Sequence, residues 1–152
     1  MYLSTNRASI SLASTPVSLV KGYFSLYGSG YVESEFLYKD ELGTGDGGVA
    51  INAQDLGIFM DALMKGELVS EESLNQMQDW FDIRGGGKNG YGLEYFEHDA
   101  GISYGHTGGV DGFTSFVDYF PEEEVTITVL FNFSMGTEAH FNATLDLSLI
   151  HI

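Results

Sequence analysis

The fold of this chain is decided by the stretch Gly105-His106-Thr107-Gly108-Gly109-Val110-Asp111-Gly112-Phe113. A short strand-like run, 101–104, precedes it, and a second strand-like run, 113–120, follows it. The glycines around the His-Thr-Gly triplet, which leaves the first strand, allow a ligand to approach the backbone because no Cβ atom stands in the way. The pattern therefore predicts a strand, a segment accessible to a ligand, and a second strand.

Further strands are predicted on both sides of this stretch. The run Val125-Thr126-Ile127-Thr128-Val129 alternates apolar and polar residues, which is typical of a strand with one buried face. The sequence Pro121-Glu122-Glu123-Glu124 supplies a turn before that strand. The four predicted strands are 91–97, 102–107, 114–120 and 125–133. Short connections between consecutive strands predict an antiparallel meander.

Upstream of the meander, apolar residues at spacings of three and four predict a first helix that ends near Lys65. Asn52 or Asp55 is its candidate N-cap, and Gly66 stands at its end. The residues of its predicted apolar face are Leu56, Phe59, Met60 and Leu63.

A second helix is predicted to begin after Ser70. Glu71 and Glu72 suit the positive end of its dipole. Its predicted apolar face consists of Leu74, Met77, Trp80 and Phe81, and the glycines at 85–87 end the segment.

The ends of the chain complete an α+β pattern. Residues 1–19 are expected to be irregular or to form a short helix. Residues 39–48, before the first helix, are expected to form a loop. Aromatic-rich runs at 20–27 and 31–38 flank Gly28-Ser29-Gly30, which predicts a β-hairpin. A final helix is predicted over 137–150. The expected fold is an antiparallel sheet meander with flanking helices in a single domain, 1–152.

Composition excludes several classes of function. The chain has 152 residues, no cysteine and a net charge of −16. Binding to a phosphate backbone requires basic patches, so nucleic acid is not an expected partner. No apolar run approaches the 18 residues of a membrane span, and the first ten residues lack a secretory-signal pattern. The absence of cysteine excludes disulfides, a thiolate nucleophile and Cys-ligated zinc, and leaves the compartment open.

An ordered set of blocks in this chain resembles one protein family. The blocks are Gly90-Tyr91-Gly92-Leu93, Gly105-His106-Thr107-Gly108-Gly109, Gly112-Phe113-Thr114-Ser115 and Phe120-Pro121-Glu122. Over roughly residues 20–150 the chain is similar to the C-terminal part of the serine hydrolases of the β-lactamase and penicillin-binding-protein superfamily. The branch that it resembles holds class C β-lactamases, D-alanyl-D-alanine carboxypeptidases and esterases. Members are often extracytoplasmic, and the chain itself would be the C-terminal portion of a longer β-lactamase-like domain.

The resemblance implies roles for His106, Thr107, Gly108 and Gly109 as a substrate and oxyanion edge. The backbone N–H of Gly109 would be one of two oxyanion donors, and the Thr107 hydroxyl would face a substrate carboxylate or carbonyl. His106 would line the pocket and influence its electrostatics. The alternative interpretation is a glycine-rich turn between two strands.

The two other active-site motifs of the family have only chance matches here. Ser18-Leu19-Val20-Lys21 has the spacing of the nucleophile motif Ser-x-x-Lys, but the residues after Lys21 resemble a strand instead of a helix. Ser73-Leu74-Asn75 has the spacing of Ser-x-Asn, but it lies in the first turns of an amphipathic helix. We therefore assign no catalytic residue in this chain.

Other chemistries are not supported by the sequence. The chain has no Gly-x-Ser-x-Gly elbow of the α/β-hydrolases. Glu97-His98-Asp99 and His106 have no recognised zinc spacing, and we expect neither metal nor cofactor. His140 and His151 are expected on the surface of the last helix.

The expected reaction of the family is acyl transfer to water on a D-alanyl peptide, a β-lactam or an ester. The chain alone is expected to be inactive. The alternatives are a non-catalytic binding or interaction module, or a structural half that needs a partner chain. An unpaired edge on the last strand, 125–133, would favour a homodimer, strand exchange, or an internal substitute from the hairpin at 20–38.

Overall fold

The computed structural model describes residues 9–10, 20–25, 30–34, 49–84, 87–98, 101–110 and 112–134. The helix predicted over 137–150 and the loop predicted over 39–48 lie outside the described residues. Within them the fold is α+β, as predicted, with two helices and antiparallel sheets.

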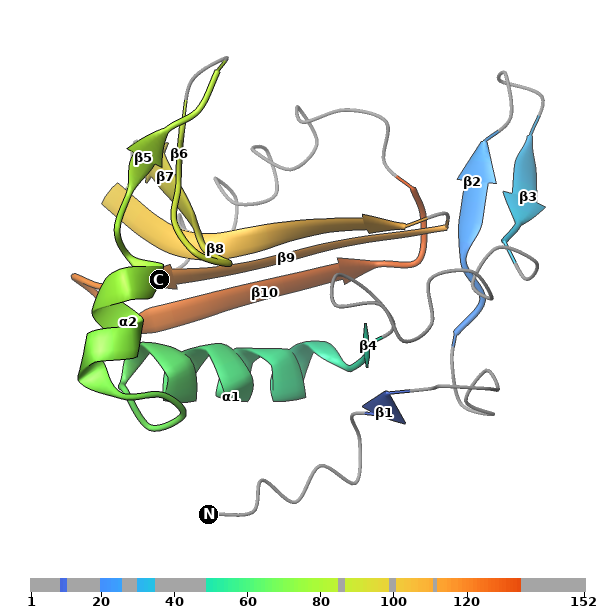
Figure 1. The fold of residues 1–152 in the computed structure, drawn as a ribbon. Helices are drawn as coiled ribbons and strands as arrows, with labels where there is room; N and C mark the ends of the chain where they lie inside the picture. The colour runs from blue at the N-terminus through green and yellow to red at the C-terminus, as the bar shows by residue number, and fades with distance from the viewer. Residues whose placement is uncertain are drawn as a thin grey trace.

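The largest element is a six-stranded antiparallel sheet in the order β10-β9-β8-β7-β6-β5 (Figure 1). Its strands follow one another in sequence, so the predicted meander is confirmed. Their bounds are Phe81–Asp82 (β5), Lys88–Asn89 (β6), Glu94–His98 (β7), Gly101–Val110 (β8), Phe113–Phe120 (β9) and Val125–Phe131 (β10).

Helix α1, Ala53–Met64, covers one face of this sheet and runs along β10 and β9 (Figure 1). Asn52 is its N-cap, because the Asn52 side chain accepts a hydrogen bond from the N–H of Asp55 at 2.9 Å. Thr126 of β10 donates a hydrogen bond to the Asp61 carboxylate of the helix, and the helix lies so close to β10 at Gly57 that an added Cβ there would be 3.3 Å from the Thr128 Oγ1.

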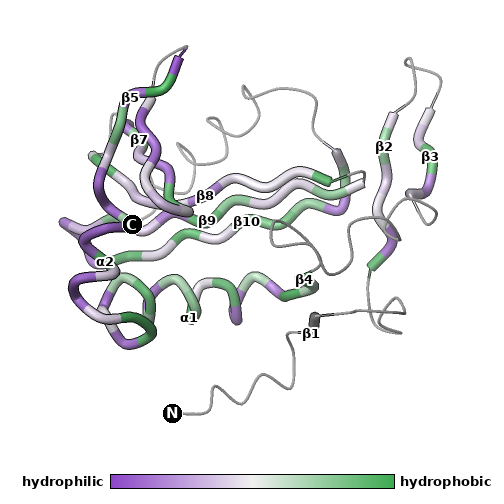
Figure 2. The backbone as a smooth tube through the Cα atoms, viewed as in Figure 1, coloured by the Kyte–Doolittle hydropathy of each residue, from purple (hydrophilic) through white to green (hydrophobic). Residues whose placement is uncertain are grey.

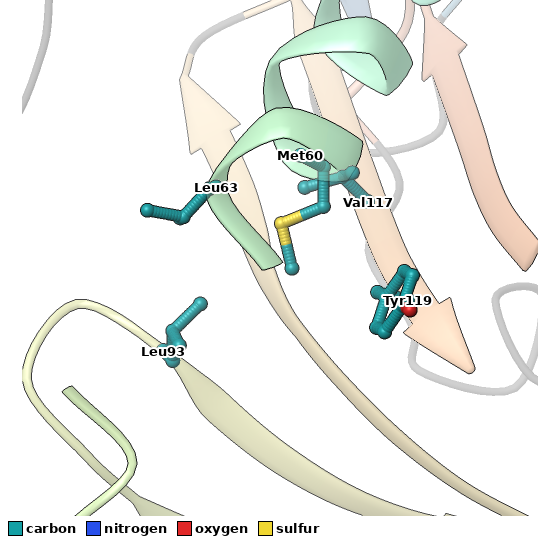
Figure 3. Packing of buried hydrophobic residues seen from close by; sticks show 5 residues of the cluster. All are labelled: Met60, Leu63, Leu93, Val117 and Tyr119. Atoms are coloured by element: carbon teal, nitrogen blue, oxygen red, sulfur yellow. The ribbon is translucent and has the colours of Figure 1, made fainter. Parts of the chain in front are cut away.

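The core lies between α1 and the sheet. Met60 and Leu63 from α1 meet Val117 and Tyr119 of β9 and Leu93 before β7 (Figure 3). Apolar and polar residues alternate over most of β10 (Figure 2), which gives this strand one apolar face, whereas β9 carries apolar residues on both faces. On the other face Phe120 is fully buried, and Phe116 packs against Phe131.

The predicted apolar face of α1 was wrong at Phe59, which is 44% exposed. The residues that contact the core from α1 are Leu56, Met60, Leu63 and Met64. They follow spacings of four, three and one, so the buried stripe passes beside Phe59.

Helix α2, Glu71–Met77, is shorter than predicted, and Trp80 and Phe81 do not belong to it. The carbonyl of Met77 accepts a hydrogen bond from the N–H of Tyr91 at 3.0 Å, so the turn before β7 binds the last residue of the helix. Trp80 packs instead on Tyr95 and Tyr104, with ring centroids 5.5 and 5.1 Å away. Phe81 begins β5 and is 53% exposed. Gly87 therefore lies between β5 and β6, two strands that the sequence analysis did not predict.

Two small sheets lie outside the main one. The predicted hairpin is confirmed as β2, Tyr23–Ser25, paired antiparallel with β3, Tyr31–Glu33. It stands at the end of the sheet away from α2 (Figure 1). A second pair joins β1, Ser9–Ile10, to β4, Val49–Ala50, which corrects the expectation of an irregular or helical segment at those two N-terminal residues.

The hairpin reaches the main sheet just beyond β10 and at Gly112, between β8 and β9, whose carbonyl lies 3.2 Å from the N–H of Tyr23. Tyr23 forms a parallel bridge with Phe133 just beyond β10, and the N–H of Tyr23 donates to the carbonyl of Asn132 at 3.0 Å. The hairpin is thus joined to the continuation of β10. Among the described residues, no strand pairs with the outer edge of β10 itself. A homodimer or strand exchange at that edge stays a prediction.

Candidate functional site

The second half of β8 has a free edge in the described part of the chain. Strand β7 pairs with β8 only from Gly101 to Gly105, because β7 begins at Glu94, opposite Gly105. The chain before Glu94 turns away through Gly92, whose φ is +73°. Strand β9 continues along the other side of β8 as far as Val110. The His-Thr-Gly triplet therefore lies inside a strand instead of leaving it, on a segment that is paired on one side.

Two backbone donors point to this free edge. The N–H of Thr107 turns away from β9 and donates to the Glu94 carboxylate at 2.8 Å. Successive residues of an antiparallel strand direct their N–H groups to opposite sides, so the N–H of Gly109 points to the same edge. The N–H groups of His106 and Gly108 face β9. We call His106–Gly109 the recognition edge from here on.

The glycines of this strand have different roles. A Cβ at Gly105 would lie 2.0 Å from the Val117 carbonyl oxygen, and a Cβ at Gly108 would lie 2.3 Å from the Ser115 Oγ. These two positions accommodate neighbours on β9. A Cβ at Gly109 would meet nothing within 4 Å, so this backbone is open to solvent.

His106 is exposed and its ring has a defined orientation. Its Nδ1 is hydrogen-bonded to the carbonyl oxygen of Thr107. A carbonyl can only accept, so Nδ1 carries the proton, and Nε2 is the acceptor in the neutral ring. The imidazole thus lies against the backbone of the recognition edge.

A polar chain lies on one face of the sheet beside this edge. Glu94, Gly105 and Asp118 are register partners on β7, β8 and β9, so the two carboxylates face each other across a residue with no side chain. Ser103, two residues before Gly105, donates to the Asp118 Oδ1 at 3.1 Å and contacts the His98 Nε2 at 2.9 Å. Since the hydroxyl has one proton, the His98 Nε2 donates to Ser103.

Burial raises the pKa of the Asp118 carboxyl to about 6. Only 1% of this residue is exposed, and loss of water disfavours the charged form. The hydrogen bond from Ser103 opposes this shift, and the negative charge of Glu94 adds to it. Asp118 therefore changes its charge near neutral pH, directly against the backbone of Gly105.

On the opposite face of the sheet, aromatic side chains lie next to the recognition edge. Trp80, Tyr95 and Tyr104 pack together, with ring centroids 5.1–5.8 Å apart. Tyr104 precedes His106 by two residues, so both side chains lie on this face. Lys88 lies 4.5 Å from the Tyr95 ring centroid. The recognition edge therefore separates a polar face from an aromatic one.

The structure places His106, Thr107, Gly108 and Gly109 inside β8, and their role as a substrate and oxyanion edge stays a prediction. Ser73 lies in the first turn of α2, where its N–H and hydroxyl are both hydrogen-bonded to the Ser70 Oγ. Lys21 precedes a strand and forms an ion pair with Glu33 at 2.8 Å, while Ser18 lies outside the described residues. These positions do not resemble a nucleophile helix.

Glu94 and Asp118 were missed by the sequence analysis. Asp118 had a recognisable signal, because it is a carboxylate inside the apolar run Phe116-Val117-Asp118-Tyr119-Phe120. Glu94 had none, since its role depends on where β7 begins.

The described residues offer neither a metal site nor a membrane-spanning helix. They contain no group of three or more His, Cys, Asp or Glu side chains that could hold a metal ion. No helix in this part of the chain is long and apolar enough to cross a membrane.

Comparisons with known proteins show a similarity that extends over most of this chain. The protein-family model described as Beta-lactamase matches residues 6–150. A penicillin-binding protein from Bacillus halodurans superposes with a TM-score of 0.76 at 20% identity, over 94% of this chain and 44% of its own. A D-amino acid amidase from Ochrobactrum anthropi SV3, complexed with L-phenylalanine, gives a TM-score of 0.80 at 21% identity, over 96% of this chain and 46% of its own. A D-stereospecific amidohydrolase from Streptomyces sp. gives a TM-score of 0.72 at 20% identity, over 84% of this chain and 39% of its own.

The chain thus spans less than half the length of these three solved structures. The likeness extends over most of this chain and shows that the chain shares the fold of these proteins.

Proposed function

The chain belongs to the beta-lactamase family, within the superfamily of serine β-lactamases and penicillin-binding proteins, and from this premise we propose that it supplies the substrate-recognition edge of a serine hydrolase. The reaction would be acyl transfer to water through an acyl-serine intermediate. The recognition edge, His106–Gly109, would hold the substrate, and the nucleophile would come from a segment with a Ser-x-x-Lys motif on a helix.

The observation that carries this proposal is the pair of N–H groups on the free edge of β8. Thr107 and Gly109 direct their backbone donors to the side that β7 leaves unpaired. Donors that are already fixed in a strand stabilise an oxyanion without reorganisation when charge develops on the substrate carbonyl. In this proposal the N–H of Gly109 is an oxyanion donor and the N–H of Thr107 contacts the substrate beside it.

The proposed substrate class is supported by the family and by the residues that lie next to the edge. D-Alanyl peptides, β-lactams, and small esters or amides all present a carbonyl that an extended strand can bind. The D-amino acid amidase and the D-stereospecific amidohydrolase among the similar structures support amides of D-amino acids as candidates. The aromatic cluster of Trp80, Tyr95 and Tyr104 next to His106 offers an apolar surface for a substrate side chain.

A second candidate function is a structural half that associates with a partner chain. The outer edge of β10 carries no paired strand within the described residues, and the hairpin bridges to Phe133 just beyond it. An unpaired strand edge presents free backbone groups that recruit another strand. Such a partner, or a second copy of this chain, would bind along Val125–Phe131.

We expect the chain alone to give no covalent adduct with a serine-reactive phosphonate and no burst with a chromogenic β-lactam. An acyl-enzyme requires a serine that is activated by a nearby base, and Ser73 and Lys21 are engaged in other contacts. Intact-mass spectrometry of the treated chain, with an intact serine β-lactamase as the positive control, measures this directly. Stoichiometric labelling of a serine, mapped by peptide sequencing, would contradict the proposal that the nucleophile comes from another segment. A label on Ser18 would show that Ser18 and Lys21 form the nucleophile motif after all.

A further inference from the structure

Glu94 occupies a donor of the recognition edge. Its Oε2 accepts the hydrogen bond from the N–H of Thr107 at 2.8 Å, at a partly buried position. Glu94 opens β7 opposite Gly105, so its backbone is held by the sheet ladder while its side chain reaches along the edge. A carboxylate of the chain itself thus lies where a ligand would approach Thr107.

The charges around Glu94 leave this position negative. Asp118 faces it across Gly105 on the same face of the sheet. Lys88 pairs in register with Tyr95, which places it on the opposite face, and its Nζ lies 3.8 Å from Glu97. The whole chain adds to this field with a net charge of −16.

We propose that Glu94 is a specificity-determining residue that makes the recognition edge select ligands with an ammonium group, or with no charge, over ligands with a carboxylate. This inference rests on the proposed function. It also changes the expectation from the family resemblance, in which Thr107 faces a substrate carboxylate or carbonyl, because only the carbonyl remains compatible with the charge beside it.

The expected selectivity comes from the difference in free energy between a bound carboxylate ligand and a bound ammonium ligand. A ligand carboxylate that takes the N–H of Thr107 displaces Glu94, which then lacks its donor and repels the new charge. A ligand ammonium next to the edge instead forms a charge-assisted hydrogen bond with the Glu94 carboxylate and meets no repulsion from it. Selectivity arises from the repulsion as much as from the attraction.

The test uses three probes with one scaffold and different charges. They are D-phenylalanine amide as the cation, N-acetyl-D-phenylalanine amide as the neutral probe and N-acetyl-D-phenylalanine as the anion. Dissociation constants are measured by ¹⁵N NMR titration of the full chain at pH 6.5, below the usual α-amino pKa of about 8. We expect the cation to bind about tenfold more tightly than the anion, the ratio given by roughly 1.4 kcal/mol.

The variant Glu94→Gln should remove most of this preference. Glu97→Gln is the matched control, because it removes the same charge from the same strand at a side chain that is 71% exposed and lies 3.8 Å from the Lys88 Nζ. The control should keep the preference of the wild type. In the wild type itself, 1 M salt should reduce the preference, because it shortens the screening length to about 3 Å.

The possible outcomes separate this inference from the proposed function. If none of the three probes binds at the recognition edge of the wild type, the proposed function fails. If the cation binds no more tightly than the anion, or if its preference over the anion is undiminished in Glu94→Gln or in 1 M salt, the role of Glu94 is overturned and the recognition edge stands.

Discussion

Replacing Gly105 with alanine is expected to destabilise the chain by about 3 kcal/mol, at the upper end of the range for overpacking in a dense interior. The new Cβ would lie 2.0 Å from the Val117 carbonyl oxygen and 2.6 Å from the Asp118 Oδ1. The carbonyl belongs to β9, so it can move only if the ladder between β8 and β9 is distorted. Urea unfolding, followed by the fluorescence of Trp80, measures the loss.

Gly109→Ala is the matched control for this substitution. It lies four residues further along the same strand, and an added Cβ would meet nothing within 4 Å. Neither glycine has a φ in the left-handed region, so the comparison isolates the steric clash from backbone strain. Equal stabilities of the two variants would show that β9 does not lie against Gly105, and the geometry derived for Asp118 would be wrong.

Asp118→Asn is expected to stabilise the chain at pH 7 by roughly 2 kcal/mol. Burial raises the pKa of the Asp118 carboxyl from 3.8 to about 6 in the folded state. Between these two values the folded chain keeps a proton that the unfolded chain has lost, so stability falls as the pH rises through this window. Asparagine has nearly the same shape, accepts the hydrogen bond from Ser103 and carries no charge.

The measurement is the unfolding free energy of both proteins from pH 4 to pH 8. The advantage of Asp118→Asn should be small near pH 4, grow up to about pH 6 and stay constant above it. Glu97→Gln, at an exposed side chain, should follow the wild type across the same range. An advantage that does not change with pH, or a variant that is less stable at pH 7, would mean that the Asp118 carboxylate is stabilised by its partners despite its burial.

The sequence predicted the meander because strand patterns are local. The alternation at 125–129 and the aromatic run at 113–120 place residues of β10 and β9 within a few positions of the observed bounds. The end of α2 could not be predicted in the same way. It depends on the Tyr91 N–H, which binds the carbonyl of Met77 across the turn before β7. The apolar periodicity of Trp80 and Phe81 fitted a longer helix equally well.

The residues of the candidate site likewise fall into those that a local sequence pattern reveals and those that depend on contacts between distant strands. His106, Thr107, Gly108 and Gly109 are recognisable as a block in the sequence, and the structure places all four on one strand. Glu94 joins them only because β7 starts opposite Gly105, a register that no local pattern specifies. The polar chain from His98 through Ser103 to Asp118 likewise requires three strands to be in register.

The central claim is that the free edge of β8 binds the substrate through the N–H groups of Thr107 and Gly109. A ¹⁵N NMR titration with N-acetyl-D-phenylalanine amide, which carries no charge, tests this claim apart from the role of Glu94. The account predicts that the amide signals of Thr107 and Gly109 shift most, and that those of Val125–Phe131 stay in place. Saturable shifts that map to β10 or to the hairpin β2–β3, with Thr107 and Gly109 unchanged, would contradict it.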